Sequence, residues 1–432
     1  MSLWQLALKS LWNRRLSVGL TVFAIAVSVA LLLTVERVRH ESRSSFAQTV
    51  SGVDMIVGAR GGSSQLLLYS VFRLGEATGN FSWGTFEKLR GHPQVAWAIP
   101  VSLGDSHRGY RVLATDNSYF AHYRTGDNRP LVFASTARPK TGTTDTEPAG
   151  HFSGIYDVVA GSEVARKLGY SIGDTLVLSH GIAENALSDH SDRPFTLTGI
   201  LEPTGTPVDR TLHITLAGME ALHVDWQNGA PPLGPGLDAD TIERMNLTPT
   251  SITAAFVGLK SRLAVFSLQR GLNTYPQEPL SAILPGVALA ELWQSFALME
   301  RILLLVSACV VGAGLLGLLA VMLTSLNERR RELAILRAVG ARPRHIFSLL
   351  MLESGLVGLA GVATGLLLFH ALLLGLRPWL ASEFGLFIGL RWPAPNEWLI
   401  LAAVVLAAFV SGLLPALRAY RNLLVDGLTP RV

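Results

Sequence analysis

The residues of this chain that could do chemistry include a scattered set of histidines. Nine of the eleven histidines lie between the first and second apolar runs of the sequence. Because neutral imidazole is a common metal ligand, the candidate ligands are His180, His190, Asp192 and His223. No pair among them has the tight spacing of a zinc motif, which favours scattered surface histidines over a metal site. Metal handling stays open as an alternative function.

Three common motifs for nucleotide binding or hydrolysis are missing from the sequence. None of the five lysines follows a glycine, so the phosphate-binding loop GxxxxGK[ST] is absent, as are GxSxG and HExxH. The glycine-rich stretch at 57–64 lacks a lysine and favours a turn. We therefore predict that the chain is not an enzyme by itself and binds no cofactor. The segment 57–80 receives no role from these patterns.

Four apolar runs are long enough to be membrane spans, and only 16% of the chain is charged. A helix needs roughly 20 apolar residues to cross about 30 Å of hydrocarbon. The first run is longer than the core of a typical signal peptide, which favours an uncleaved anchor. The runs cover residues 17–35, 302–326, 346–376 and 398–417.

The distribution of basic residues predicts the orientation of these spans. Arginine and lysine are concentrated in the segments 1–16, 327–345 and 418–432, whereas the connection 377–397 contains only Arg377 and Arg391. Because short basic segments stay in the cytoplasm, both ends of the chain are predicted to be cytoplasmic. Residues 36–301 are then outside. The basic clusters adjoin apolar runs, which argues against a nucleic-acid partner.

The long segment outside has the composition of an ordinary globular domain. Alternating residues predict strands at 175–178 and 195–201, and helix patterns occur at 86–90 and 162–168. Two stretches rich in glycine and proline, 138–150 and 229–236, are predicted loops. The fold class expected is therefore an α-helical membrane protein with four transmembrane helices and a large α+β extracytoplasmic domain.

An apolar stripe precedes the second span. Its members, spaced three or four residues apart, are Leu289, Leu292, Phe296 and Met299. This pattern fits a helical stalk that extends the span outward, and it fits equally an amphipathic helix packed on its own domain.

The charged segment 327–345 (NERRRELAILRAVGARPRH) contains a short amphipathic helix. Leu333, Leu336 and Val339 are predicted to share one face. Gly340 is placed to end the helix, and Pro343 is expected to keep it from resuming. A short helix on the cytoplasmic side is suited to docking in a groove of a partner.

Several stretches resemble the MacB/FtsX/LolC-type ABC transporter permeases. The run 328–341 (ERRRELAILRAVGA) resembles their loop signature, and 161–176 with 195–201 is similar to their periplasmic domain. Residues 352–361 resemble the start of their third span, and 415–421 resembles their C-terminal exit. The topology of one span, a large outer domain and three spans is also that of the family. The macrolide exporters of the family carry an ATPase on the same chain, so this chain resembles the permease-only type.

The resemblance implies a dimer of permease chains bound to separate ATPase subunits, in which ATP and Mg²⁺ belong to the partner. The coupling helix would contain Glu328, Arg329, Arg330, Arg331, Glu332, Leu333, Leu336, Arg337, Val339 and Gly340. It would transmit motion to the outer domain in a bacterial inner membrane, moving a hydrophobic, lipid, lipoprotein or peptide cargo. Contacts with lipid and with a periplasmic accessory protein are also implied. A non-transporting, FtsX-like regulator of a periplasmic partner is the other alternative.

The third apolar run contains Glu353, the one carboxylate within a predicted span. A charge inside the membrane is costly, so we expect Glu353 to snorkel or to bond to a neighbouring helix. The same run contains small residues that allow close helix packing, namely Gly355, Gly358, Gly361 and Gly365.

Overall fold

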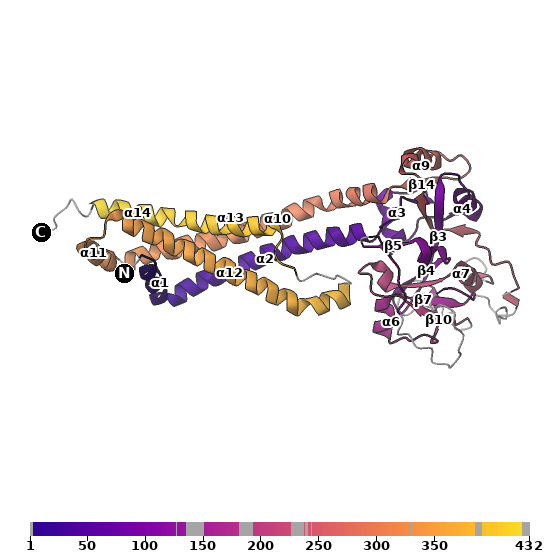
Figure 1. The fold of residues 1–432 in the computed structure, drawn as a ribbon, viewed down its shortest axis with the longest axis horizontal. Helices are drawn as coiled ribbons and strands as arrows, with labels where there is room; N and C mark the ends of the chain where they lie inside the picture. The colour runs from indigo at the N-terminus through magenta and orange to yellow at the C-terminus, as the bar shows by residue number, and fades with distance from the viewer. Residues whose placement is uncertain are drawn as a thin grey trace. The chain divides into compact units, whose positions relative to one another are not determined.

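The structure, a computed structural model, describes residues 3–126, 128–134, 151–180, 193–225, 237, 241–242, 244–328, 330–384 and 391–425 (Figure 1). The chain divides into two compact units. The helical unit comprises Met1–Ser42 and Phe296–Val432, and the α/β unit comprises Arg43–Ser295. The expected loops 138–150 and 229–236 lie outside the described residues.

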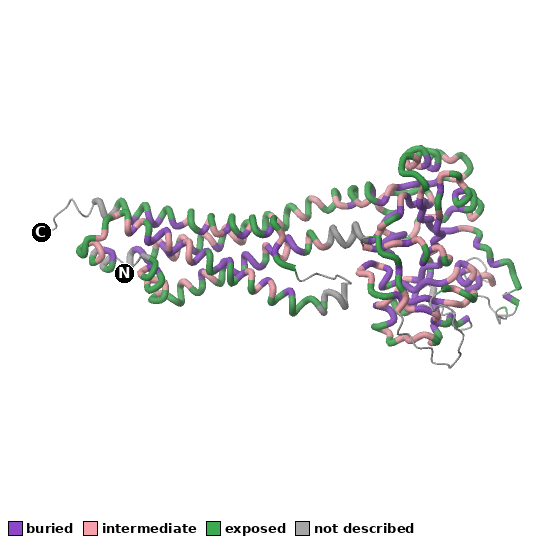
Figure 2. The backbone as a smooth tube through the Cα atoms, in the orientation of Figure 1, coloured by how far each residue is buried: buried purple, intermediate pink, exposed green. Residues whose placement is uncertain are grey.

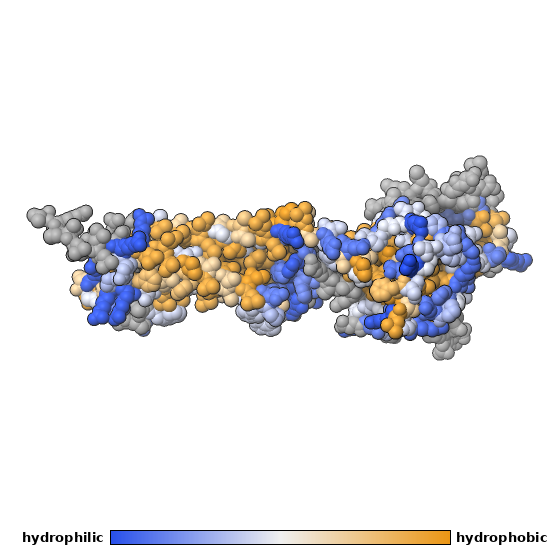
Figure 3. All heavy atoms as spheres, turned by 90° about the horizontal axis from the view of Figure 1, so that it is seen from above, coloured by the Kyte–Doolittle hydropathy of each residue, from blue (hydrophilic) through white to orange (hydrophobic). Residues whose placement is uncertain are grey.

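The helical unit contains four stretches that are long and apolar enough to cross a membrane. Figure 3 shows an apolar surface over the middle of this unit and hydrophilic residues at both of its ends. The expected fold class, four membrane helices with a large α and β domain between the first two, is confirmed. The helices are α2 (Arg15–Gln48), α10 (Pro285–Glu328), α12 (Pro343–Phe384) and α13 (Pro395–Ser411), the last followed by α14 (Leu413–Val425).

The helices extend beyond the apolar runs, because backbone hydrogen bonding continues into polar residues once a helix has formed. The N-terminal tail is itself a helix, α1 (Leu3–Asn13), which the sequence patterns did not predict. It exposes Trp4, Leu8 and Trp12, a stripe typical of helices that lie at a membrane surface. The fourth run is interrupted between α13 and α14 at Gly412, where an added Cβ would lie 2.1 Å from Ser354 Oγ.

The α/β unit is built on a ten-stranded mixed sheet with the order β14-β1-β13-β3-β4-β11-β7-β10-β8, and β9 pairs with β3. The pairs β4–β11 and β7–β10 are parallel. The strands are β1 (Met55–Ala59), β3 (Val95–His107), β4 (Tyr110–Thr115), β7 (Asp157–Ala160), β8 (Thr175–Leu176), β9 (Ser179–His180), β10 (Phe195–Ile200), β11 (Thr211–Thr215), β13 (Ala254–Leu259) and β14 (Leu280–Ile283).

Both faces of this sheet are buried under apolar clusters. Figure 2 shows buried residues throughout the interior of the α/β unit. Successive residues of a strand point to opposite faces. Accordingly, Met55 and Val57 belong to one apolar cluster, whereas Ile56 between them belongs to the other. Both clusters require covering helices, which are α3 (Ser63–Ser70), α4 (Trp83–Arg90), α5 (Ser118–His122), α6 (Ser162–Leu168), α7 (Leu216–His223) and α9 (Val265–Asn273).

The predicted helices and strands of this unit occur where the patterns placed them, with shifted ends. Helix α4 begins three residues before the predicted position, since the Ser82 hydroxyl accepts a hydrogen bond from the Thr85 N–H at 3.3 Å. Helix α6 ends at Gly169, whose φ of 71° is the left-handed conformation that favours glycine. Strand β8 covers only the first half of the predicted strand at 175–178.

The apolar stripe before the second span changes its environment along α10. Ala288 and Leu292 are buried, and Leu289 packs against the same apolar cluster of the α/β unit as Ala288. Phe296 and Met299 are exposed. The first turns of α10 therefore pack on the α/β unit, as expected for an amphipathic helix packed on its own domain. The helix also continues without a break to Glu328, as expected for a stalk that extends the second span.

His213 on β11 is a buried histidine that the fold keeps neutral. Its ring lies 5.1 Å from that of Tyr119, between ring centroids, and its Nδ1 is 3.3 Å from the Val159 carbonyl oxygen. Burial, assisted by the charge of Arg73, lowers its pKa to about 3.

We expect the α/β unit to lose stability as the pH falls from about 6.5, the ordinary histidine value, towards 3. In this range the unfolded chain binds a proton that folded His213 does not, which costs up to about 1.4 kcal/mol per pH unit. Hydrogen exchange of β11 in the full chain, corrected for intrinsic rates, measures the slope of the unfolding free energy against pH. His213→Gln should flatten the slope and His151→Gln, at an exposed position, should not; identical slopes in both variants would contradict the assignment.

Candidate coupling helix and membrane-core contacts

The charged segment between the second and third spans folds as α11 (Arg330–Ala338). Gly340 ends it with φ of 100°, donating its N–H to the Arg337 carbonyl at 2.9 Å, while the Ala341 N–H reaches the Leu336 carbonyl at 3.0 Å. These two bonds satisfy the last carbonyls of the helix in a Schellman motif. Pro343 was expected to keep α11 from resuming, and it is also the first residue of α12. Its missing N–H costs nothing at that position, because the first N–H groups of a helix have no intrahelical partner.

The side chains of α11 are divided between the bundle and the surface. Leu333 is buried and Leu336 is half-buried, and both pack against the apolar cluster of the helical unit. Val339 is 83% exposed and Ile335 is 57% exposed. Leu333, Leu336 and Val339, which were expected to share one docking face, therefore differ in exposure. The large apolar side chains that stay exposed here are Ile335 and Val339.

Most charged residues of the segment precede α11 or lie in its first turn. Helix α10 ends at Glu328, and α11 begins with Arg330 and Arg331. Glu332 is exposed and Arg337 is half-buried. Arg329 lies outside the described residues.

Glu353 of α12 is buried and forms an ion pair. Its side chain is 1% exposed, and its Oε2 lies 3.1 Å from Nη2 of Arg14, the residue between α1 and α2. Burying a carboxylate in an apolar bundle is costly unless a cation compensates it. The ion pair thus links the beginning of the chain to the third span.

A second buried ion pair joins the first and fourth spans and was not predicted. Arg37 of α2 donates through Nε and Nη2 to the two carboxylate oxygens of Glu397, both at 2.9 Å. Neither side chain exceeds 3% exposure. The Arg37 guanidinium also lies 5.6 Å from the ring centroid of Phe369 on α12. Glu397 additionally accepts the Ala394 N–H at the start of α13, at 2.7 Å.

The sequence does contain a signal for this pair. Arg37 follows the first apolar run and Glu397 precedes the fourth, so the predicted topology places both at the outer ends of their spans. Hydropathy windows exclude such flanking residues, and the separation of 360 positions conceals the pairing.

The glycines of α12 contact two different helices. An added Cβ at Gly358 would lie 2.4 Å from Ala408 Cβ of α13, and one at Gly355 would lie 3.2 Å from the Phe409 ring. At Gly361 the same atom would be 2.6 Å from Ile25 of α2, and at Gly365 it would be 2.8 Å from the Ala26 carbonyl oxygen. The absence of side chains lets α12 approach both neighbours closely.

The candidate metal ligands are only partly described. His190 and Asp192 lie outside the described residues, and β9 brings the backbone of His180 opposite Asp105. His223 Nε2 lies 3.7 Å from Asp105 Oδ1. Among the residues that the structure describes, no three histidine, cysteine or acidic side chains gather as a metal site would require. Metal binding at these residues therefore stays an untested alternative.

We expect Gly358→Ala to destabilise the helical unit by about 1–3 kcal/mol, because the added methyl group must push α12 and α13 apart. Gly375→Ala is the matched control on the same helix, where an added Cβ meets nothing within 4 Å. The control should be neutral or stabilising by up to about 1 kcal/mol, since alanine favours helix. Thermal unfolding in detergent micelles measures both, and equal shifts would contradict the packing argument.

Two family models match this chain. The MacB-like periplasmic core domain matches residues 18–243, which is more than half of the chain, and the FtsX-like permease C-terminal domain matches residues 304–423.

Individual relatives carry names from the same group of proteins. A macrolide export ATP-binding/permease protein, MacB of Nitrosomonas europaea, is 33% identical over 126 residues, which is 28% of this chain and 18% of that protein. A pyoverdine export ATP-binding/permease protein, PvdT of Pseudomonas entomophila, is 24% identical over 98% of this chain and 59% of its own length. The chain thus spans less than two thirds of these relatives.

A solved structure, the periplasmic region of MacB from Actinobacillus actinomycetemcomitans, aligns with 56% of this chain and 94% of its own, at 11% identity and a TM-score of 0.32. The family assignment rests on the two family models rather than on this alignment. Together with the four apolar helices and the large domain between the first two, they show that the chain belongs to the MacB/FtsX-like ABC transporter permease family.

Proposed function

We propose that this chain is the membrane subunit of an ABC transporter whose ATP is hydrolysed by a separate subunit, and that α11 receives the motion of that ATPase. The observation that supports this role most directly is the division of α11 into two sides. Leu333 anchors the helix in the bundle, whereas Ile335 and Val339 remain exposed. An exposed apolar pair on a short anchored helix suits insertion into a groove of a partner.

The helices on either side of α11 would carry its motion. Helix α12 begins three residues after Gly340 and packs against α1, α13 and α14. Helix α10 runs uninterrupted from Pro285, in the α/β unit, to Glu328 directly before α11. A displacement of α11 would therefore act on both helices through short connections that allow little slack.

The cargo proposed is a hydrophobic compound, a lipid or lipoprotein, or a peptide, moved outward or extracted from the membrane of a bacterial cell. The names of two relatives, which refer to macrolide export and pyoverdine export, support outward movement of a substance that is not a simple ion. We further propose that two permease chains pair in the working transporter, with both ends of each chain in the cytoplasm.

We expect Ile335→Glu and Val339→Glu to abolish or strongly weaken association with the ATPase, because a charge would enter an apolar contact. The measurement is co-purification of tagged chain with the candidate ATPases of its own cell, followed by ATP turnover of the complex.

Two further variants make this experiment specific. Leu263→Glu, at a 94% exposed position in the α/β unit, should leave association unchanged. Leu333→Glu should instead lower the unfolding temperature, since Leu333 packs in the bundle. If no ATPase accompanies the wild-type chain, or if Ile335→Glu and Val339→Glu behave as Leu263→Glu does, α11 is not the coupling element.

A further inference from the structure

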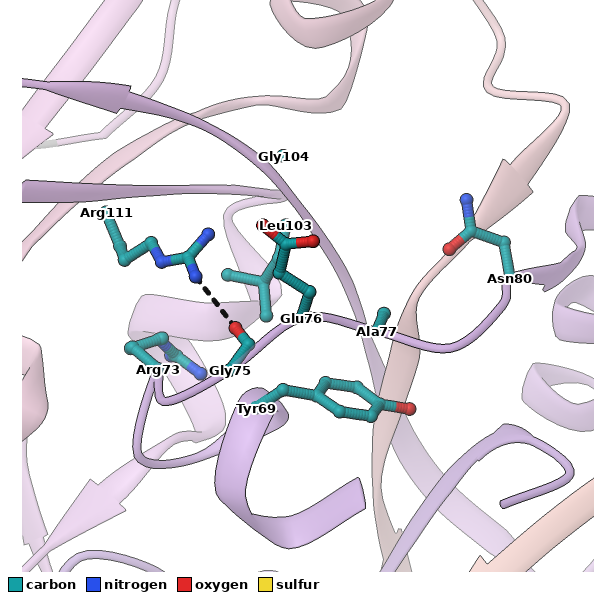
Figure 4. A pocket seen from close by; sticks show the side chains of 9 residues that line it. All are labelled: Tyr69, Arg73, Gly75, Glu76, Ala77, Asn80, Leu103, Gly104 and Arg111. Carbon is teal, nitrogen blue, oxygen red and sulfur yellow. Dashed lines mark hydrogen bonds between the residues drawn. The ribbon is translucent and has the colours of Figure 1, made fainter. Parts of the chain in front are cut away.

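The α/β unit contains a cavity of about 280 Å³ at the segment that joins α3 to β2 (Phe81–Ser82). This segment belongs to residues 57–80, to which the sequence patterns assigned no role. Figure 4 shows the cavity between this segment and strands β3 and β4. Its polar lining comes from Tyr69, Arg73, Glu76, Asn80 and Arg111.

Arg73 is a buried cation without a counter-charge. The residue is 8% exposed, and its Nε and Nη1 have no hydrogen-bond partner among the described residues. No described carboxylate forms an ion pair with it, in contrast to Arg14 and Arg37 in the helical unit. Burial of an unpaired charge is strongly unfavourable, so a fold that maintains one has a use for it or a partner for it.

The backbone at Arg73 is also strained. Its backbone φ of 60° is in the left-handed region, which residues other than glycine rarely adopt. Such residues cost of order 1–3 kcal/mol and are concentrated at binding sites and active sites. The strain and the unpaired charge occur at the same residue.

The buried polar groups that interact with Arg73, namely Tyr119, Tyr123 and His213, are uncharged and cannot neutralise it. Burial raises the pKa of Tyr119 to about 12 and also raises that of Tyr123, so both phenols keep their protons. Burial and the Arg73 charge together hold the pKa of His213 near 3, so its ring is neutral at pH 7. Arg73 therefore presents a full positive charge to the cavity that it lines.

A second arginine is fixed in the same wall. Nη2 of Arg111 donates to the carbonyl oxygen of Gly75 at 2.7 Å, the bond drawn in Figure 4. Burial raises the pKa of Tyr69 to about 12, so its hydroxyl remains a donor. Two guanidinium groups with neutral donors nearby form a surface complementary to carboxylate or phosphate oxygens. Glu76, exposed at the same cavity, provides one acceptor for a donor on the ligand.

We propose that this cavity is a binding site for a small molecule that carries an oxyanion, a carboxylate or a phosphate, held by Arg73 and Arg111. The ligand's anionic group provides the counter-charge that Arg73 lacks within the fold. The cavity volume limits the bound part to a small molecule or to the charged end of a larger one. This inference does not depend on the coupling proposal, because binding at this site is measured with no ATPase present.

The test is isothermal titration of the purified full chain, in maltoside micelles that contain no phosphate, with inorganic phosphate and separately with diglycine. Potassium chloride keeps the ionic strength constant, so that general screening is the same throughout. We expect saturable binding of at least one probe. Binding of phosphate alone identifies a phosphate-type ligand, and binding of diglycine alone identifies a carboxylate with an accompanying amine.

Three variants locate the site. Arg73→Gln should weaken binding about tenfold or more, the effect of losing a charged hydrogen bond, and Arg111→Gln should weaken it as well. Arg60→Gln is the matched control, an exposed arginine before α3 that donates to the Asn273 carbonyl oxygen and does not line the cavity. If Arg73→Gln does not fold, Arg111→Gln alone decides. Absence of binding by wild type, or equal binding by Arg111→Gln and Arg60→Gln, would overturn the proposal.

Discussion

The helical unit depends on one interaction above all, the buried ion pair between Arg37 and Glu397. Two charges in an apolar environment are tolerated only when they satisfy each other, and here both carboxylate oxygens meet guanidinium nitrogens at 2.9 Å. The pair fixes the first span against the fourth at one level, and the ring of Phe369 places the third span beside it. The Arg14–Glu353 pair fixes the first and third spans at another level. Between these two levels, the glycines of α12 allow α2 and α13 to pack closely against α12. The bundle is therefore held in register by two ion pairs and is densely packed between them.

The broad plan of the fold could be predicted from the sequence because the membrane imposes strong and simple constraints. Helix length and hydropathy identify the spans. The orientation indicated by the arginine distribution stays a prediction. Helix α6 and strand β10 were also predictable, since alternation and helical periodicity are local properties. The end of α11 followed from Gly340, whose left-handed φ few other residues adopt readily.

The parts that could not be predicted depend on residues far apart in the chain. Glu353 was predictable as a polar residue of functional or structural interest because it lies within a span. Its partner Arg14 was not predictable, because it lies among other basic residues of the N-terminal segment. Leu336 and Val339 share a helical periodicity, yet only tertiary packing determines that one meets the bundle and the other the surface. Similarly, Arg73 and Arg111 lie in different elements, and only the folded sheet brings them to one cavity. Local patterns contain no information about such contacts.

A double-mutant cycle on Arg37 and Glu397 tests most directly the claim that a buried ion pair holds the bundle together. The variants are Arg37→Met, Glu397→Gln, which keeps an acceptor for the Ala394 N–H, and the combination of both. Each single change leaves one buried group uncompensated and should cost about 3–5 kcal/mol in the free energy of unfolding, measured in mixed micelles. The double variant should cost much less than the sum of the two, because no unpaired charge remains. Costs that simply add would show that the two residues do not interact, and would contradict this account of the helical unit.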